Sequence, residues 1–470
     1  MILSDHSQRH GFTRRRFLAG LGAGLAAGVP LGWLAVKQFD KLKRIDSDFG
    51  SFTGISKEDP NPKFAMPGPY PGRVIEVRHP GSVKADNTVE PTAVQKMMAR
   101  GMKELTGADH PAEAWRRFFE AGDVVGIKVN PVGLRHRPEA VPVISNPEVV
   151  IEIVKGLKSA GVKSKDIIVF ERYAAEFRDV YKPLMFEREL QGVRWYASSA
   201  DGGENQCDIE GLEGRDRDPM VVGYDPDVFV HMGFAGPTQD PKDDRRFRSH
   251  LSVIITRLVN KFINVPVLKD HRSGGVTLAL KNLSHGLNNN VWRTHISGIY
   301  RLDGSQSGPN QCNTFIPTAA SHLAIRQKAT LHIMDGLIGV YEGGPGSWNR
   351  TWATWPRQSL FFATDPVAMD HVGWDIIDTK RAEMGWRPVA QMGLASSTPA
   401  MTLSTRLAAL AAHSPCEALP LEAGTEYFEG GRGTEVFDRR QPEHIILASM
   451  IGLGVFDARQ IDHRRIGLTA

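Results

Sequence analysis

Short apolar runs that alternate with helical patterns are the feature that most constrains the fold of this chain. Residues 123–130 read Asp-Val-Val-Gly-Ile-Lys-Val-Asn, a composition typical of a strand that is buried on both faces. Residues 147–160 predict a helix that is capped by Asn146 and stopped by Gly161. Residues 167–170 then predict another buried strand. This alternation predicts an α/β fold with a largely parallel sheet and flanking helices.

The other predicted elements fill a chain of 470 residues that is 41% hydrophobic and 23% charged, which is typical of a globular protein. Further strands are predicted at 73–77, 258–268, 329–334 and 359–363, and further helices at 91–105 and 111–121. We expect a signal or anchor at 1–36, a linker at 37–71, and a single α/β domain at 72–470 with an irregular, charged insertion near 200–250.

The N-terminal segment resembles a twin-arginine export signal. Three arginines, Arg14, Arg15 and Arg16, precede Phe17 and Leu18, and an apolar Gly/Ala-rich run follows as far as residue 36. The resemblance implies export of the folded protein through the twin-arginine translocation machinery, and hence a periplasmic location.

The uncharged part of that segment is about as long as a membrane-spanning helix. Two fates therefore stay open, cleavage or retention as an anchor in the inner membrane. An ordinary transmembrane helix behind a basic N-terminus is the alternative interpretation of the whole segment.

The charge of the chain gives no reason to expect nucleic-acid binding. The formal net charge is +4, and residues 1–28 contribute +3 of it through four arginines and one aspartate. The remainder is close to neutral, so it lacks the basic character that a nucleic-acid surface requires.

Three cysteines stand far apart in the sequence, at Cys207, Cys312 and Cys416. No Cys-x-x-Cys pattern is present, so the chain has neither a ferredoxin-type iron–sulfur motif nor a thioredoxin motif. Three isolated buried thiols are one interpretation, and one disulfide with an odd thiol is the other.

The densest polar cluster follows the predicted strand that ends at residue 268. It contains Lys269, His271, Lys281 and Asn282, with a Gly-Gly turn between the two lysines. Ligand sites in α/β sheets lie at such strand ends, and exposed backbone N–H groups bind anions. The cluster predicts a phosphate or carboxylate site, and the alternative is a capped turn with solvated lysines.

Two other predicted strands contribute to the same pocket. A lysine at the end of a buried strand is costly unless it is paired or faces a ligand. The predicted ligand-binding residues are Lys128, Asn130, Lys269, Lys281, Asn282 and Asp335. His271 is the candidate general acid–base among them.

A divalent metal is a further hypothesis for this region. Carboxylates suit a hard cation, and the candidate ligands are Asp335, Asp365 and Asp370, with His271 as a fourth. No ordered metal motif accompanies them. Asp365 stands before a proline, which also predicts a structural helix cap.

Two loops have functional and structural interpretations. Residues 285–295 carry two histidines that could be ligands or simple hydrogen-bonding groups. Residues 343–356 carry three tryptophans that could close over a ligand or cover the core.

Several ordered blocks resemble the domain-of-unknown-function family 362. The blocks lie at residues 126–130, 263–271, 275–282, 334–336, 363–370 and 448–461. The resemblance implies one α/β domain with a ligand pocket formed by these blocks, but no assigned reaction. Many relatives carry iron–sulfur ferredoxin segments, whose cysteines this chain lacks.

Together these patterns predict an exported protein that binds an anionic small molecule or cofactor. Acid–base or cofactor-dependent redox chemistry on that molecule is the expected activity, and the cofactor is not identified by any motif. The alternative is a non-catalytic periplasmic ligand-binding or assembly factor.

Overall fold

The computed structural model describes most of the predicted domain. The described residues are 63–134, 139–200, 218–232, 242–271, 274–294, 312–347, 351–386, 388–391 and 442–469. The predicted export signal, the first part of the predicted linker, Cys207 and Cys416 lie outside them. Within these ranges, no helix is both long and apolar enough to cross a membrane.

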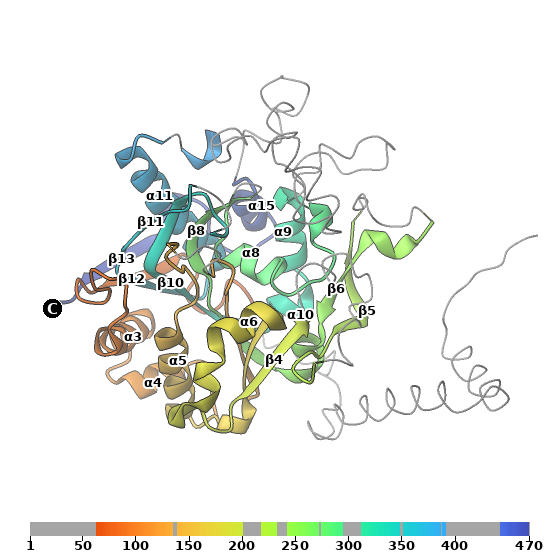
Figure 1. The fold of residues 1–470 in the computed structure, drawn as a ribbon, viewed down its shortest axis with the longest axis horizontal. Helices are drawn as coiled ribbons and strands as arrows, with labels where there is room; N and C mark the ends of the chain where they lie inside the picture. The colour runs from red at the N-terminus through yellow and green to blue at the C-terminus, as the bar shows by residue number, and fades with distance from the viewer. Residues whose placement is uncertain are drawn as a thin grey trace, which may run out of the picture. The chain divides into compact units, whose positions relative to one another are not determined.

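An eleven-stranded sheet forms the centre of the domain (Figure 1). Its main order is β13-β1-β12-β10-β7-β2-β3-β4, while β8 and β11 pair with β10, and β9 pairs with β8. The strands are β1 Arg73–Arg78, β2 Val125–Lys128, β3 Ile167–Tyr173, β4 Arg194–Ser199, β7 Lys261–Asn264, β8 Val267–His271, β9 Gly275–Val276, β10 Ala329–Glu342, β11 Ala353–Trp355, β12 Ser359–Ala363 and β13 Asp462–Gly467.

Most strand pairs are parallel, which confirms the predicted α/β fold. The run from β10 through β7, β2 and β3 to β4 is parallel throughout, whereas β12 is antiparallel to both β10 and β1. The last strand, β13, pairs in parallel with the first strand, β1.

Helices cover both faces of the sheet. They are α3 Pro91–Thr106, α4 Pro111–Arg116, α5 Pro147–Ser159, α6 Ala174–Tyr181, α8 Ala279–Ser284, α9 Cys312–Ala320, α10 Leu323–Arg326, α11 Pro366–Glu383 and α15 His444–Met450. Figure 1 shows α3, α4 and α5 together at one side, and α8, α9, α11 and α15 at the other. Successive strand residues point to opposite faces, so Val125 and Ile127 join the core under α5 while Lys128 points toward α8.

Two helix starts follow the rules by which they were predicted. The side chain of Asn146 accepts a hydrogen bond from the backbone N–H of Glu148 at 2.9 Å and so caps α5. Asp365 caps α11 in the same way by accepting from Ala368 N at 2.9 Å, and Pro366 occupies the first turn.

Three elements differ from the prediction. The predicted strand 258–268 is divided into β7 and β8, because Pro266 has no N–H to donate to a neighbouring strand. The predicted strand 329–334 continues through Asp335 to Glu342, so Asp335 lies inside β10 and not after it. The predicted helix 111–121 ends at Arg116.

The described parts of the predicted insertion and of the predicted linker take part in regular structure and packing. Within the predicted insertion, β5 Tyr224–His231 and β6 Arg248–Ser252 form a separate antiparallel pair. In the predicted linker, Phe64 and Met66 are buried, and Met66 N donates to Arg326 O at 2.9 Å. Packing of the domain therefore begins before residue 72.

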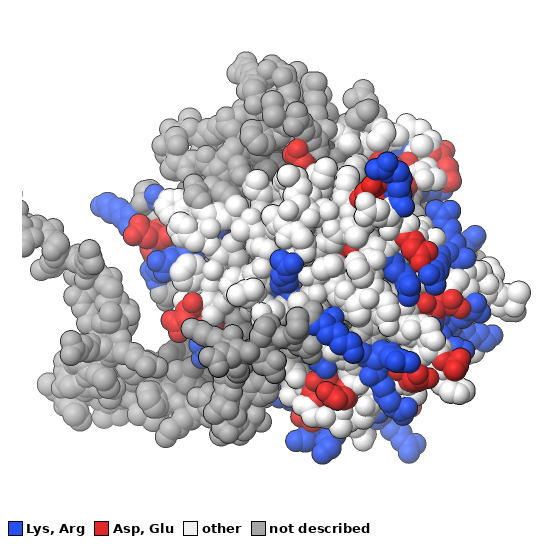
Figure 2. Space-filling model, turned by 180° about the vertical axis from the view of Figure 1, so that it is seen from behind, with Lys and Arg blue, Asp and Glu red and all other residues white. Residues whose placement is uncertain are grey.

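The surface of the domain is mixed in charge. Figure 2 shows one face on which lysines and arginines lie between aspartates and glutamates, beside a broad uncharged area. Because charges of both signs are interspersed on this face, their electric fields partly cancel.

Candidate functional site

Polar side chains gather where the parallel strands end, on the face of the sheet that carries α8. Lys128 ends β2 and Asn264 ends β7, and the two residues are direct partners in the sheet register. Glu171 lies near the end of the adjacent strand β3. Because α/β sheets bind ligands at the carboxyl ends of their strands, this edge carries the candidate site.

Lys128 is fully buried and has a complete set of partners. Its ammonium forms an ion pair with Glu171 and donates to Val129 O at 2.7 Å and to Asn282 Oδ1 at 3.2 Å. Burial lowers the pKa of Lys128, while the charge and hydrogen bond of Glu171 oppose that effect. An ammonium has three N–H donors, so these partners leave Lys128 none for a ligand.

Lys269 is likewise surrounded by acceptors. It lies in β8, and its amine contacts Asn130 Oδ1 at 3.3 Å, Val143 O at 3.3 Å and Val132 O. Burial lowers the pKa of Lys269 to about 7. The amine therefore fastens the loop after β2 to β8.

Asn282 accepts from Lys128 directly and is linked to Lys269 through Asn130. Its Oδ1 accepts from Lys128 Nζ and, at 3.4 Å, from Asn130 Nδ2, while its Nδ2 donates to Asn264 Oδ1 at 2.7 Å. The structure thus brings together four of the predicted residues, Lys128, Asn130, Lys269 and Asn282. They form one internal network of hydrogen bonds.

Lys281 is buried on the same helix but lacks such partners. It is 7% exposed, and none of the hydrogen bonds or ion pairs of the described residues involves its amine. Burial lowers the pKa of Lys281 to about 8, against an opposing effect of Cys312. A desolvated amine without an acceptor is a site where an anion would be stabilised.

Two more buried polar groups without partners lie on the helices packed beside α8. Neither ring nitrogen of His444 has a hydrogen-bond partner in the described structure, although this residue of α15 is fully buried. The backbone N–H of His444 donates to Asn313 Oδ1 at 3.2 Å, and the Nδ2 of Asn313 also lacks a partner. Burial and the charge of Lys281 lower the pKa of His444 to about 3, so its ring is neutral.

A thiol completes this second group. Cys312 begins α9 and is buried, which both interpretations of the cysteines allow. Its Sγ lies 3.8 Å from both His285 Nε2 and Thr294 Oγ1, which are 2.8 Å apart. Burial raises the pKa of Cys312 despite the opposing charge of Lys281, which favours the thiol over the nucleophilic thiolate.

Lys269 and His271 lie inside β8, together with Asp270, so the prediction that these two members of the cluster follow a strand is wrong. Asp270 accepts from the backbone N–H groups of Gly343 at 3.1 Å and Gly344 at 2.7 Å. A side chain at Gly344 would meet Asp270 O at 2.0 Å, so this close approach requires glycine. His271 Nδ1 accepts from Gly274 N at 3.1 Å, and a neutral His271 therefore carries its proton on Nε2.

The three carboxylates proposed for a metal serve different parts of the backbone. Asp335 accepts from Asn146 N at 2.7 Å and Leu337 N at 2.9 Å. Asp370 accepts from Ala279 N at 2.7 Å and Leu280 N at 2.9 Å, at the start of α8. Asp365 accepts from Gly72 N and Val455 N, both at 2.9 Å, besides capping α11.

These carboxylates do not form the predicted metal site. Nowhere among the described residues do three or more His, Cys, Asp or Glu side chains come together in a way that could hold a metal ion. Burial raises the pKa of Asp335 and of Asp365 to about 6 and that of Asp370 to about 8, against their backbone hydrogen bonds. Their chemistry is that of buried caps.

The described parts of the two loops with open interpretations contain one buried tryptophan and one buried histidine. Trp352 is buried in the core and donates through Nε1 to Val141 O at 2.8 Å. His285 is buried and bonded to Thr294 and Ser284. His295 and Trp348 lie outside the described residues.

Several site residues were missed by sequence reasoning. They are Glu171, Cys312 and His444. Glu171 lies near the end of a buried strand, as Lys128 does, so the same signal could have found it. Cys312 and His444 join the site only through the packing of α9 and α15 against α8, which no local pattern reveals.

Comparisons with known proteins find a similarity to one family over part of the chain. Residues 238–375 match the model described as Domain of unknown function (DUF362). Four of the six blocks that suggested this family lie inside the matched range, at 263–271, 275–282, 334–336 and 363–370. No curated protein matches the chain.

Solved structures give weaker similarities. The lactate racemase apoprotein from Thermoanaerobacterium thermosaccharolyticum is 11% identical, with 84% of this chain and 83% of that chain covered and a TM-score of 0.33. A protein from Thermotoga maritima is 10% identical, with 54% and 51% covered and a TM-score of 0.28. At these scores neither structure supports a statement about function. What the comparisons show is a match between residues 238–375 of this chain and the model of the domain-of-unknown-function family 362.

Proposed function

We propose that this protein binds a small anionic molecule, a ligand or a cofactor, in its interior beside α8, α9 and α15. The observation that carries the proposal is Lys281, a residue that is only 7% exposed and whose amine has no acceptor among the described residues. An ionised group in such a place is stabilised best by an opposite charge, and a carboxylate or phosphate would supply one.

The neighbours of Lys281 support a ligand that also forms neutral hydrogen bonds. A neutral His444 offers one donor and one acceptor nitrogen, and Asn313 offers the N–H groups of its Nδ2. A ligand with an anionic group for Lys281 and hydroxyl, carbonyl or amide groups for the other two would satisfy all three residues.

The other predicted residues have supporting roles in this proposal. Lys128, Asn130 and Lys269 spend their donors on protein acceptors, so they position Asn282 and the loop after β2 without touching the ligand. His271 remains the candidate general acid, because a neutral His271 carries a proton on Nε2.

A non-catalytic binding protein is the second candidate function. The state of Cys312 favours it, since burial keeps the thiol protonated although His285 lies within 3.8 Å. Turnover that depends on His271 would favour the enzyme, whereas binding without turnover would favour the alternative.

Native mass spectrometry with elemental analysis tests the binding proposal. Full-length protein purified without oxygen should carry a stoichiometric anionic molecule, and Lys281→Met should lose it. Lys328→Met is the matched control, because Lys328 is also a buried lysine with a pKa lowered to about 7, but its amine donates to Ile255 O. Equal retention of the molecule by both variants would contradict the proposal.

Export remains a separate proposal, supported by the arginines and the apolar run near the N-terminus. We expect replacement of Arg14, Arg15 and Arg16 by lysine to retain the protein in the cytoplasm. Cell fractionation that still finds the variant in the periplasm would contradict export by the twin-arginine pathway.

A further inference from the structure

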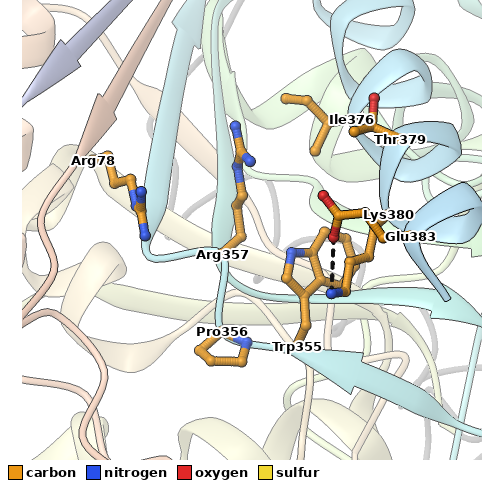
Figure 3. Close-up of a pocket in the computed structure, with 8 residues that line it drawn as sticks. All are labelled: Arg78, Trp355, Pro356, Arg357, Ile376, Thr379, Lys380 and Glu383. Atoms are coloured by element: carbon orange, nitrogen blue, oxygen red, sulfur yellow. Dashed lines mark hydrogen bonds and ion pairs between the residues drawn. The ribbon is translucent and has the colours of Figure 1, made fainter.

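A second, solvent-facing site is formed by residues of β1, β11, β13 and α11 and of the loop after β11. Two cavities of about 300 Å³ and about 150 Å³ adjoin there, and both are lined by Arg78 and Arg357. Figure 3 shows the smaller cavity, with the two arginines, Trp355 and the α11 side chains around it.

The larger cavity has an excess of positive charge. Three arginines line it, Arg78, Arg357 and Arg465, against the single carboxylate of Glu76. Burial alone would raise the pKa of Glu76, but hydrogen bonds from His463 and Arg357 and the charge of Arg357 lower it to about 2. Glu76 is therefore ionised, and one carboxylate cannot neutralise three guanidinium groups.

Arg78 is the arginine that has no protein partner. Its side chain is exposed, and the hydrogen bonds and ion pairs of the described residues do not include it. By contrast, Arg357 donates to Glu76 Oε1 through Nε at 3.1 Å and through Nη2 at 2.7 Å. Arg465 approaches Glu76 only to 3.8 Å and is 71% exposed.

The smaller cavity adds an apolar wall. Trp355, Pro356 and Ile376 line it, and its two other charged residues, Lys380 and Glu383, neutralise each other in an ion pair of 3.1 Å, drawn as a dashed line in Figure 3. Its volume of about 150 Å³ is comparable to that of a cavity that holds one benzene ring. The two cavities together therefore offer cationic and ring-sized apolar space side by side.

We propose that this groove binds a small organic phosphate, with the phosphate between Arg78, Arg357 and Arg465 and the organic group against Trp355. Guanidinium groups bind phosphate through paired N–H donors, which a lysine cluster cannot reproduce. The proposal does not depend on the interior site, since Lys281, Asn313 and His444 do not line either cavity.

Calorimetric titration of the full-length protein with phenyl phosphate and with inorganic phosphate tests the proposal. We expect phenyl phosphate to bind more tightly, and Arg78→Gln to weaken its binding at least tenfold. Arg188→Gln is the matched control, because Arg188 is another exposed arginine, in the short helix Arg188–Leu190 on a different part of the surface. Unchanged binding to Arg78→Gln would overturn the site.

A variant that fills the cavity provides a second test without removing charge. Gly467 lines the larger cavity, lies opposite Arg78 in the register of β1 and β13, and has no atom within 4 Å of the place where a Cβ would lie. We expect Gly467→Leu to fold normally and to lose phenyl phosphate. Full affinity in this variant would place the ligand elsewhere.

Two further measurements assign the parts of the ligand. Trp355→Leu should remove the higher affinity for phenyl phosphate over inorganic phosphate, and an unchanged difference in affinity would overturn the placement of the ring against Trp355.

Vesicles containing phosphatidic acid distinguish a lipid headgroup from a soluble phosphate as the ligand. Sedimentation with these vesicles that is lost in Arg78→Gln would identify a lipid headgroup, and binding of phenyl phosphate alone would identify a soluble phosphate.

Discussion

Lys128 and Lys281 are both buried lysines beside Asn282, yet their surroundings differ completely. Lys128 meets a carboxylate, a carbonyl and an amide oxygen, whereas the amine of Lys281 meets no acceptor among the described residues. The first lysine is part of the structure that holds the site together. The second is the kind of uncompensated group that a protein retains for a ligand.

The largest predicted effect on stability is at Lys128. We expect Lys128→Met to lower the free energy of unfolding by about 3–5 kcal/mol, because it leaves Glu171 buried without its partner. Urea denaturation followed by circular dichroism measures this loss. The double variant Lys128→Met, Glu171→Leu should recover part of it, and a loss equal to the sum of the single variants would contradict the paired role.

Lys281 should respond in the opposite direction. We expect Lys281→Met to raise the free energy of unfolding of ligand-free protein by about 1–3 kcal/mol at pH 7, because the variant removes a buried charge without a partner. The same urea experiment on protein stripped of ligand measures it. A clear destabilisation would mean that the amine has an essential partner within the protein.

A smaller effect is predicted for the pH dependence of stability, which also distinguishes Lys281 from Lys128. The pKa of Lys281 is about 8 in the folded protein and 10.5 in its unperturbed state, so between these values the unfolded chain binds the extra proton. The stability of the wild type should therefore rise with pH in this window. We expect the advantage of Lys281→Met to shrink by about 2 kcal/mol between pH 7 and pH 10, and a constant advantage would place the pKa elsewhere.

The sequence predicts the fold best where the rule is local. The caps at Asn146 and Asp365 depend on neighbours within three residues, and both are confirmed. The long strand predicted at 258–268 failed at Pro266, since apolar composition alone does not show which N–H groups a sheet needs. Strand ends likewise depend on pairing, which is why β10 extends past Asp335.

In the candidate site, too, local features could be predicted from the sequence and contacts between distant residues could not. Lysines in apolar runs are conspicuous, so Lys128, Lys269 and Lys281 could be selected from the sequence, but their separate roles could not. Whether a buried amine is satisfied depends on groups far away in the chain, such as Glu171 for Lys128. The carboxylates chosen for a metal show the same limit, because their partners are backbone N–H groups of distant segments.

The position of β1 in the sheet has a consequence for the order of events during synthesis. This strand is the first to be made, yet its two neighbours are β12 and β13, so it waits for residues 359–363 and 462–467 before its edges are covered. Contacts between such distant segments form slowly and late. The domain can close only after nearly all of the chain has left the ribosome, and an N-terminal export signal would be in the cytoplasm long before its cargo is folded.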